Sequence, residues 1–145
     1  MIRRKPFEFL EHTADAYIVA HGSTLEEAFE NAALGMFEVM TDTTRVTAKV
    51  RETVKVRAHD EHALLYRWLE TLLIKFDVKG RLYSKFSIQR IRKTSEGLSL
   101  DAVVWGEKFN RSKHAPRTDV KAVTYHRMEI DKDHDGFTIK FILDI

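Results

Sequence analysis

Two stretches of the chain repeat their apolar residues at helical spacing. The first predicts a helix over about residues 24–40 with one apolar face, formed by Leu25, Ala28, Phe29, Ala32, Ala33, Phe37 and Met40. Ser23 and Glu26 have the spacing of a capping box at its start. The second helix is expected to begin after Asp60 and end at Gly80, with an apolar face formed by Leu64, Leu65, Trp68, Leu69, Leu72, Leu73 and Phe76.

Most of the remaining chain alternates between apolar and polar residues, which is typical of half-buried strands. The segments predicted to be extended are 7–10, 16–20, 45–58, 81–92, 98–105, 120–130 and 137–145. The turn-forming residues at 95–97 and 131–136 connect neighbouring strands as hairpins. Two helices among hairpin-connected strands predict one α+β domain over residues 1–145, in which the helices pack on a largely antiparallel β-sheet.

Composition narrows the class of protein. The chain has 145 residues and no cysteine, which excludes disulfide scaffolds, thiolate zinc sites and cysteine nucleophiles. It has neither a signal peptide nor a run of about 20 apolar residues, so we expect a cytoplasmic protein that does not enter a membrane. The net charge is only +2 and basic residues are interspersed with acidic ones, so direct RNA binding is not indicated.

Several short motifs have an ordinary structural interpretation. Residues 131–136 match the start of a calcium-binding EF-hand loop, but the twelfth position is Ile142 and the flanks resemble strands, which favours a hairpin turn. The sequence has no phosphate-binding glycine loop and no hydrolase nucleophile elbow, so no small-molecule substrate is indicated. The loop at 106–119 carries four cations that suit either phosphate contact or plain solvation: Lys108, Arg111, Lys113 and Arg117.

The last nine residues remain strand-like to the end of the sequence. Their apolar side chains share one face, which places Asp144 on the other face beside the terminal carboxylate of Ile145. A cation bridging the two groups would relieve their repulsion, and oxygen ligands suit Mg²⁺, Mn²⁺ or Ca²⁺. His12, close to Asp15 in a polar segment, is either an ordinary polar residue or a group that supports a site or takes part in catalysis.

Segments spread over nearly the whole chain resemble the archease family. They are Phe9 to Asp15, Ala28-Phe29 through Met36-Phe37, Trp105-Gly106-Glu107, Lys113-His114, Val120 to His126 and Leu143-Asp144-Ile145. The resemblance implies a non-catalytic accessory protein in tRNA splicing. It would activate an RtcB-class RNA-splicing ligase by promoting guanylylation and multiple turnover, and would broaden the ligase's use of nucleoside triphosphates.

The resemblance also implies a divalent-metal site. Its ligands would be Asp15, Asp144 and the terminal carboxylate or carbonyl of Ile145, and its functional neighbours would be His12, Lys113, His114, Asp119 and Lys121. Two other functions remain open at this point. One is a chaperone-like modulator of a tRNA-modifying enzyme such as a methyltransferase. The other is a stand-alone metal-dependent phosphoesterase, which would need a fuller metal constellation than two aspartates.

Overall fold

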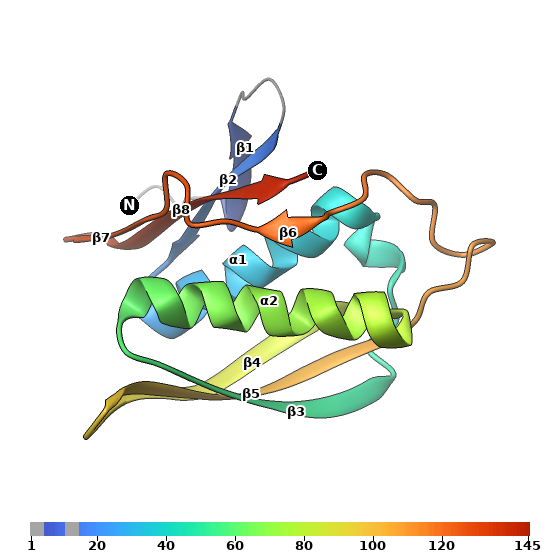
Figure 1. The fold of residues 1–145 in the computed structure, drawn as a ribbon. Coiled ribbons are helices and arrows are strands. Elements are labelled where there is room, and N and C mark those ends of the chain that lie inside the picture. Colours follow the sequence, from blue (N-terminus) through green and yellow to red (C-terminus); the bar gives the residue numbers. More distant parts are fainter. Residues whose placement is uncertain (1–4, 11–14) are drawn as a thin grey trace.

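A computed structural model describes residues 5–10 and 15–145, in which two helices lie between two antiparallel sheets (Figure 1). The helices are α1 (Leu25–Met40) and α2 (Glu61–Lys79). The first sheet has the order β1 (Phe7–Leu10), β2 (Asp15–Gly22), β8 (Gly136–Asp144) and β6 (Ala122–Val123), with β7 (Glu129–Asp133) also paired to β8. The second has the order β3 (Val50–Ala58), β5 (Gly97–Lys108) and β4 (Arg81–Thr94). The prediction of an antiparallel α+β architecture is therefore confirmed.

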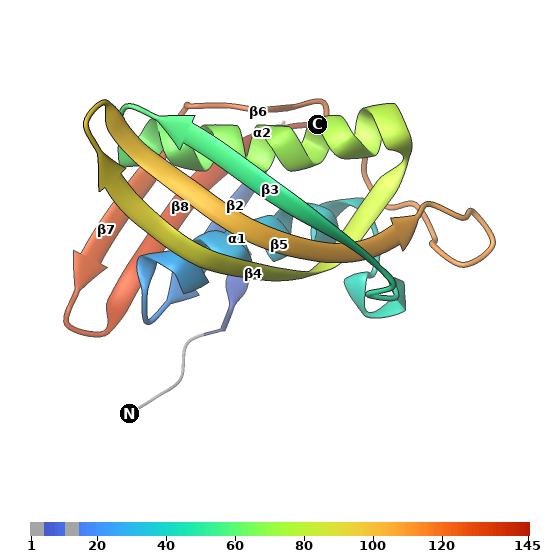
Figure 2. The same cartoon turned by 90° about the horizontal axis from the view of Figure 1, so that it is seen from below.

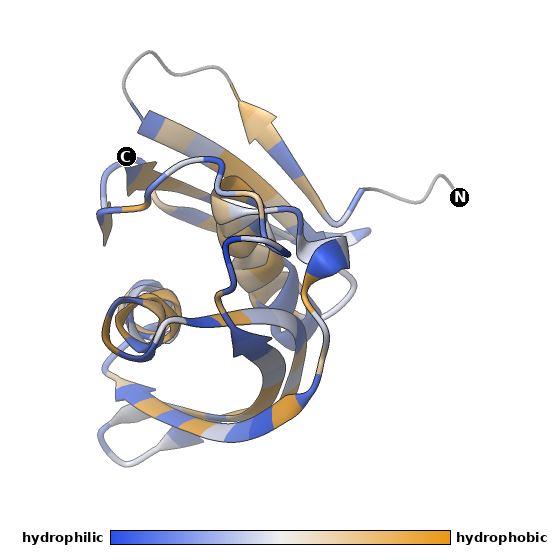
Figure 3. Cartoon of the chain, turned by 90° about the vertical axis from the view of Figure 1, so that its right-hand side faces the viewer, coloured by the Kyte–Doolittle hydropathy of each residue, from blue (hydrophilic) through white to orange (hydrophobic). Residues whose placement is uncertain are grey.

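The core fills the space between the sheets, where both helices touch both sheets. Helix α1 packs on β2 and β8 on one side and on β4 on the other, while α2 packs on β3, β5 and β6. The strands of the second sheet alternate between apolar and hydrophilic residues along their length (Figure 3). The largest fully buried side chains include Trp68, Tyr83, Phe29, Phe37 and Phe141. Each sheet consequently keeps one outer face, and these faces lie on opposite sides of the molecule (Figures 1 and 2).

The helix ends follow from local chemistry, with one correction. Helix α1 is capped by Thr24, whose hydroxyl accepts the N–H of Glu27, rather than by Ser23. The predicted capping box is thus shifted by one residue, and the Glu27 carboxylate accepts the Ser23 N–H. Helix α2 begins after the predicted cap Asp60 and ends at Gly80, whose left-handed φ of 65° suits glycine.

Two predicted strands are shorter than their patterns suggested. The strand expected at 45–58 begins only at Val50, because Asp42 caps a short 3₁₀ helix, Thr43–Arg45, that changes the chain direction first. The strand expected at 120–130 is interrupted after β6 by a turn in which Met128 N–H donates to the carbonyl of Tyr125. Arg127 adopts a positive φ of 55° in this turn, a backbone conformation that no alternating pattern reveals.

Strand β5 is the central strand of the second sheet, and β4 lies very close to it at Gly106. A Cβ at this position would lie 1.7 Å from the carbonyl oxygen of Leu82 in β4, so only glycine fits. Lys108 ends β5, and the loop that follows crosses the C-terminal end of α1 before it reaches β6. In the part of the chain that the structure describes, neither helix is long and apolar enough to cross a bilayer.

Candidate functional site

The antiparallel register of β2 and β8 places Asp15 directly opposite Asp144. Side chains opposite one another in an antiparallel pair leave the sheet on the same face, with Cβ atoms about 4.5–5.5 Å apart. That face is the outer one, since Ile18 and Ala20 of the alternate set are fully buried against α1. Asp144 is exposed and Asp15 is half-buried. Two carboxylates that are 129 positions apart in sequence therefore form a cross-strand pair where β2 begins and β8 ends.

Two of the other predicted residues, Lys121 and Ile145, adjoin this pair. The main-chain oxygen of Asp144 accepts the N–H of Lys121 at 2.7 Å, which fixes the end of β8 against β6. Asp119 and Lys121 are both exposed in the segment that leads into β6. Ile145 follows Asp144 directly, and its side chain packs against the core. His12 lies outside the described residues.

Lys113 and His114 belong to a second cluster, centred on the carboxylate of Glu107. One oxygen of Glu107 accepts three hydrogen bonds: from Lys113 Nζ at 2.6 Å, from the Thr47 N–H at 2.8 Å and from His114 Nε2 at 2.9 Å. His114 is completely buried, and its Nδ1 accepts the N–H of Asn110 at 2.9 Å. The ring therefore carries its proton on Nε2, as donation to Glu107 requires.

These donors control the charge of Glu107. Partial burial favours the neutral carboxyl and opposes ionisation, but the hydrogen bonds from Lys113, Thr47 and His114 outweigh it and lower the pKa of Glu107 to about 2. The side chain is only 13% exposed. Glu107 is consequently a permanent anion that ties the loop after β5 to the segment before β3.

The same loop is held at several further points along its course. Thr41 Oγ1 donates to the carbonyl of Ala115 at 3.0 Å, and the main-chain N–H of Arg117 donates to the carbonyl of Met40 at 2.9 Å. The Arg117 guanidinium also forms an ion pair with Glu38 at 2.7 Å. The loop is thus anchored at both ends and in the middle, so the position of Lys121 beside Asp144 is determined by the Glu107 cluster and the end of α1.

The importance of Glu107 was not predicted from the pattern of charges. It entered only as part of the Trp105-Gly106-Glu107 motif, with no role attached. A carboxylate one residue after a sterically required glycine and seven before a histidine is a signal in the sequence, but its three donors come from two separate segments. Only the folded chain shows that Thr47 is among them.

A polar cavity lies beside the Glu107 cluster. Its volume is about 280 Å³, and it is lined by Lys49, Val50, Arg81, Glu107, Lys108, Asn110 and Lys113. The first residues of β3 and β4 and the last of β5 meet at this end of the second sheet. Four of the seven lining residues are cationic, so the cavity suits an anionic group.

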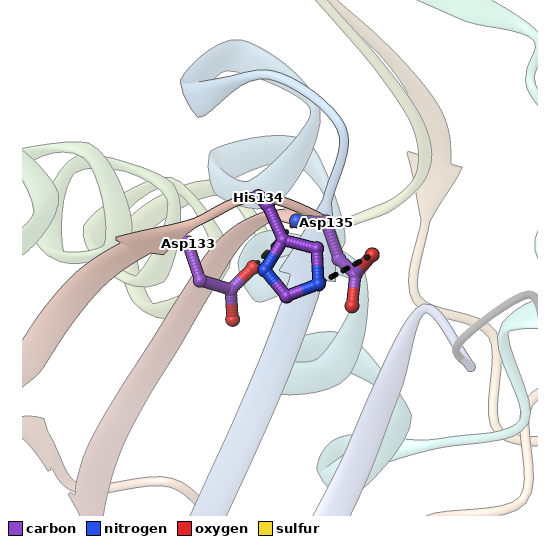
Figure 4. Close-up of side chains that lie close together, drawn as sticks. All are labelled: Asp133, His134 and Asp135. Atoms are coloured by element: carbon purple, nitrogen blue, oxygen red, sulfur yellow. Dashed lines mark hydrogen bonds and ion pairs between the residues drawn. The ribbon is translucent and has the colours of Figure 1, made fainter.

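The β7–β8 turn holds a third group of potential ligands, Asp133, His134 and Asp135 (Figure 4). Their ligand atoms lie within 4.8 Å of one another, but all three residues are exposed. Asp133 Oδ1 accepts the N–H of Asp135 at 2.8 Å, and Gly136 has a φ of 127°, so these residues build the hairpin turn. The interpretation of residues 131–136 as a turn between strands rather than an EF-hand is confirmed.

The donor set at the Asp15–Asp144 pair fits a hard divalent cation. The register gives it two carboxylates on one face, Ile145 follows Asp144 directly, and oxygen ligands are those that Ca²⁺, Mg²⁺ and Mn²⁺ prefer. Like charges directly opposite in a sheet destabilise it, and a shared cation offsets that repulsion. The small number of protein ligands leaves most of the coordination shell to water or to groups from a partner.

Comparison with known proteins gives a consistent result over the full chain. The model of the Archease protein family (MTH1598/TM1083) matches residues 7–145. "Protein archease" of Sulfurisphaera tokodaii is 48% identical over 139 residues, covering 96% of this chain and 98% of that protein. The solution structure of Methanobacterium thermoautotrophicum protein 1598 is 44% identical with a TM-score of 0.85, covering 97% of this chain and 99% of that one. A Thermotoga maritima crystal structure described as "archease, possible chaperone" covers 100% and 99%, with a TM-score of 0.60 at 20% identity, and supports the fold alone.

Proposed function

The chain belongs to the archease family, and on that premise we propose that it is a non-catalytic activator of an RNA-splicing ligase of the RtcB class. In this role it promotes guanylylation and multiple turnover of the ligase in tRNA splicing, and it broadens the nucleoside triphosphates that the ligase accepts. A divalent cation held by Asp15, Asp144 and a main-chain oxygen of Ile145 takes part.

The observation that carries this proposal is the cross-strand pairing of Asp15 with Asp144, where β2 begins and β8 ends. Both residues lie in the paired part of these strands, and Leu143 beside Asp144 is fully buried, so the register holds their main chains in place. A site at the ends of two strands can reach into the active-site cleft of a larger protein. A cation bound there would supply positive charge to neutralise phosphate oxygens during nucleotidyl transfer.

The residues around the pair have positioning roles in this proposal. The main-chain N–H of Lys121 binds the main-chain oxygen of Asp144, and the Lys121 side chain is exposed. Lys113 forms an ion pair with Glu107 and thereby holds the loop that leads to Lys121. Tyr17 is two residues after Asp15 on β2, so its side chain lies on the same face, and Leu10 of β1 is paired opposite Tyr17. Leu10 is 38% exposed, so this row adds apolar surface for contact with the ligase.

The nucleotide chemistry is assigned to the partner because this sequence has no phosphate-binding glycine loop and no hydrolase nucleophile elbow. A protein that assists and then leaves acts in catalytic amounts. We therefore expect a substoichiometric quantity of this protein to raise the number of ligation products formed per ligase molecule, while the protein alone joins no RNA ends.

The test is a multiple-turnover ligation assay with the cognate ligase, GTP and a fixed metal concentration. Asp15→Asn and Asp144→Asn should each abolish most of the stimulation while keeping the size and shape of the side chain. The control is Asp133→Asn with Asp135→Asn, which removes two carboxylate charges from the exposed β7–β8 turn and should leave stimulation intact. Unchanged ligase turnover with the wild-type protein would contradict the proposal and favour a chaperone-like role, whereas phosphate release without ligase would indicate a phosphoesterase.

A further inference from the structure

The outer face of the second sheet is open and strongly basic. Both helices pack on its inner face, where Val54, Val56, Leu100, Ala102 and Val104 are buried. Figure 2 looks onto the other face, with the helices behind the strands. Six exposed cations alternate onto it: Arg51, Lys55, Arg57, Lys85, Arg90 and Arg92.

The strand register arranges these cations in rows across the sheet. Arg51 and Lys85 flank Trp105, Lys55 and Arg90 flank Asp101, and Arg57 and Arg92 flank Ser99. Side-chain contacts confirm the shared face, since Arg90 lies 3.9 Å from the carboxylate of Asp101 and Arg92 Nε lies 3.4 Å from Ser99 Oγ. Six positive charges thus stand against the single carboxylate of Asp101 in these rows, on a chain whose net charge is only +2. The charge is concentrated on this side of the molecule.

An aromatic ring lies on the central strand at one end of the basic face. Trp105 is half-buried in the central strand, and Lys85 Nζ lies 4.5 Å from the centre of its ring. Lys85 is exposed, so its ammonium can move from the ring to a phosphate when a base occupies the ring face. A flat aromatic surface between cations is the arrangement with which open sheets bind unpaired bases, because the ring stacks on the base and the cations hold the adjacent phosphates.

We propose that the outer face of β3, β5 and β4 binds a single-stranded RNA segment, with one base stacked on Trp105 and the phosphates on the flanking cations. Rows on one face of a strand lie about 7 Å apart, so the face covers a few nucleotides. One row without a cation, formed by Thr53, Val103 and Ser87, separates the Trp105 row from the Asp101 row. The cavity beside Glu107 lies at the Trp105 end of the same strands and extends the cationic surface through Lys49 and Lys108. A duplex would not use this face in the same way, because its bases are already stacked and present no free ring to Trp105.

The proposal goes beyond the activation of a ligase, and its test needs no ligase. The Asp15–Asp144 pair lies on the outer face of the other sheet, on the opposite side of the molecule (Figure 1). Asp15→Asn with Asp144→Asn should therefore leave RNA binding unchanged. Loss of ligase stimulation and loss of RNA binding are then separate outcomes that identify which proposal has failed.

The experiment measures binding of a labelled oligouridylate of about 12 nucleotides by fluorescence anisotropy. Binding should quench tryptophan emission, and the quenching reports on Trp105 because Trp68 is completely buried. Trp105→Ala should weaken binding about fivefold or more, and Lys55→Glu with Arg57→Glu at least about tenfold. The affinity should also fall steeply between about 50 and 200 mM salt. Circular dichroism of each variant checks that the fold is retained.

The matched control is Arg67→Glu with Lys79→Glu, which makes the same change of charge at exposed positions of α2. These substitutions should change the affinity less than about twofold, since the two residues lie away from the sheet face. Equal weakening by the control pair, or binding without quenching, would show a diffuse positive charge and overturn the proposal. Tighter binding of polyglutamate or of anionic vesicles than of the oligouridylate would also overturn it, in favour of an acidic protein or a membrane surface.

Discussion

Replacement of Glu107 should destabilise the protein far more than replacement of an ordinary surface carboxylate. One oxygen of Glu107 accepts hydrogen bonds from Lys113, Thr47 and His114, and the side chain is only 13% exposed. Glu107→Ala removes all three bonds and leaves the Nε2–H of the fully buried His114 without an acceptor. An unsatisfied buried donor costs about 1–3 kcal/mol, and a hydrogen bond to a charged group contributes about 1.5–3 kcal/mol.

We therefore expect Glu107→Ala to lower the free energy of unfolding by about 2–4 kcal/mol near neutral pH. Glu107→Gln should cost less, about 1–2 kcal/mol, because an amide oxygen can still accept the three bonds but without the charge. The assay is urea denaturation followed by circular dichroism, with wild type and both variants compared at the same temperature and ionic strength.

The effect should also depend on pH, with a sign set by the pKa of Glu107. Its pKa is about 2 in the folded protein and lies at an ordinary 4.5 when the chain is unfolded. Between these values the unfolded chain binds the extra proton, so the stabilisation is complete above pH 4.5 and is lost as the pH falls toward 2. The gap between wild type and Glu107→Ala should shrink by about 1 kcal/mol from pH 7 to about pH 3, after allowance for solvent screening. A gap below about 1 kcal/mol at pH 7, or one that does not shrink with acid, would refute the reasoning.

Two further predictions concern the Asp15–Asp144 carboxylate pair and the close contact of β4 with Gly106 of β5. Isothermal calorimetry with Ca²⁺ or Mn²⁺ should show one site in wild type and none after Asp15→Asn with Asp144→Asn; equal binding by both proteins would contradict the site assignment. Gly106→Ala should destabilise the fold by about 3 kcal/mol or more, because its Cβ would meet the Leu82 carbonyl oxygen at 1.7 Å. Gly80→Ala should cost only about 1–2 kcal/mol, since a Cβ at this position meets no atom within 4 Å and the only cost is the left-handed backbone conformation. Thermal unfolding should therefore rank Gly106→Ala as the less stable variant, and the opposite order would refute the steric argument.

The elements with long, regular patterns could be predicted from sequence, and those controlled by turns could not. Helix α2 was predicted with its cap at Asp60 and its end at Gly80, because both signals are local. The break after β6 was missed because it depends on one residue, Arg127, in a left-handed conformation. The division of the strands between two sheets also lay beyond the pattern, since an alternating strand shows that it has a buried face but not which strand it pairs with.

The candidate sites, like the strands, could be predicted from the sequence only in part. Asp144 stood out in the sequence because it lies at the end of an ordered strand, but Asp15 was joined to it only by resemblance until the register placed the two opposite each other. The basic face was overlooked because Arg51, Lys55 and Arg57 alternate with acidic and apolar residues. A count of charges along the chain does not distinguish these cations from the residues between them, whereas in a strand successive side chains point to opposite faces and the cations gather on one of them.

The central claim is that the carboxylate pair of this protein promotes guanylylation of an RNA-splicing ligase, and the most direct measurement is the rate of that single step. Labelled GTP, metal and ligase are mixed with wild type, with Asp144→Asn, or with the control Asp133→Asn and Asp135→Asn, and covalent guanylate on the ligase is followed over time. Wild type and the control should accelerate guanylylation equally, and Asp144→Asn should leave it near the rate of the ligase alone. Acceleration by Asp144→Asn as strong as by wild type would contradict the account.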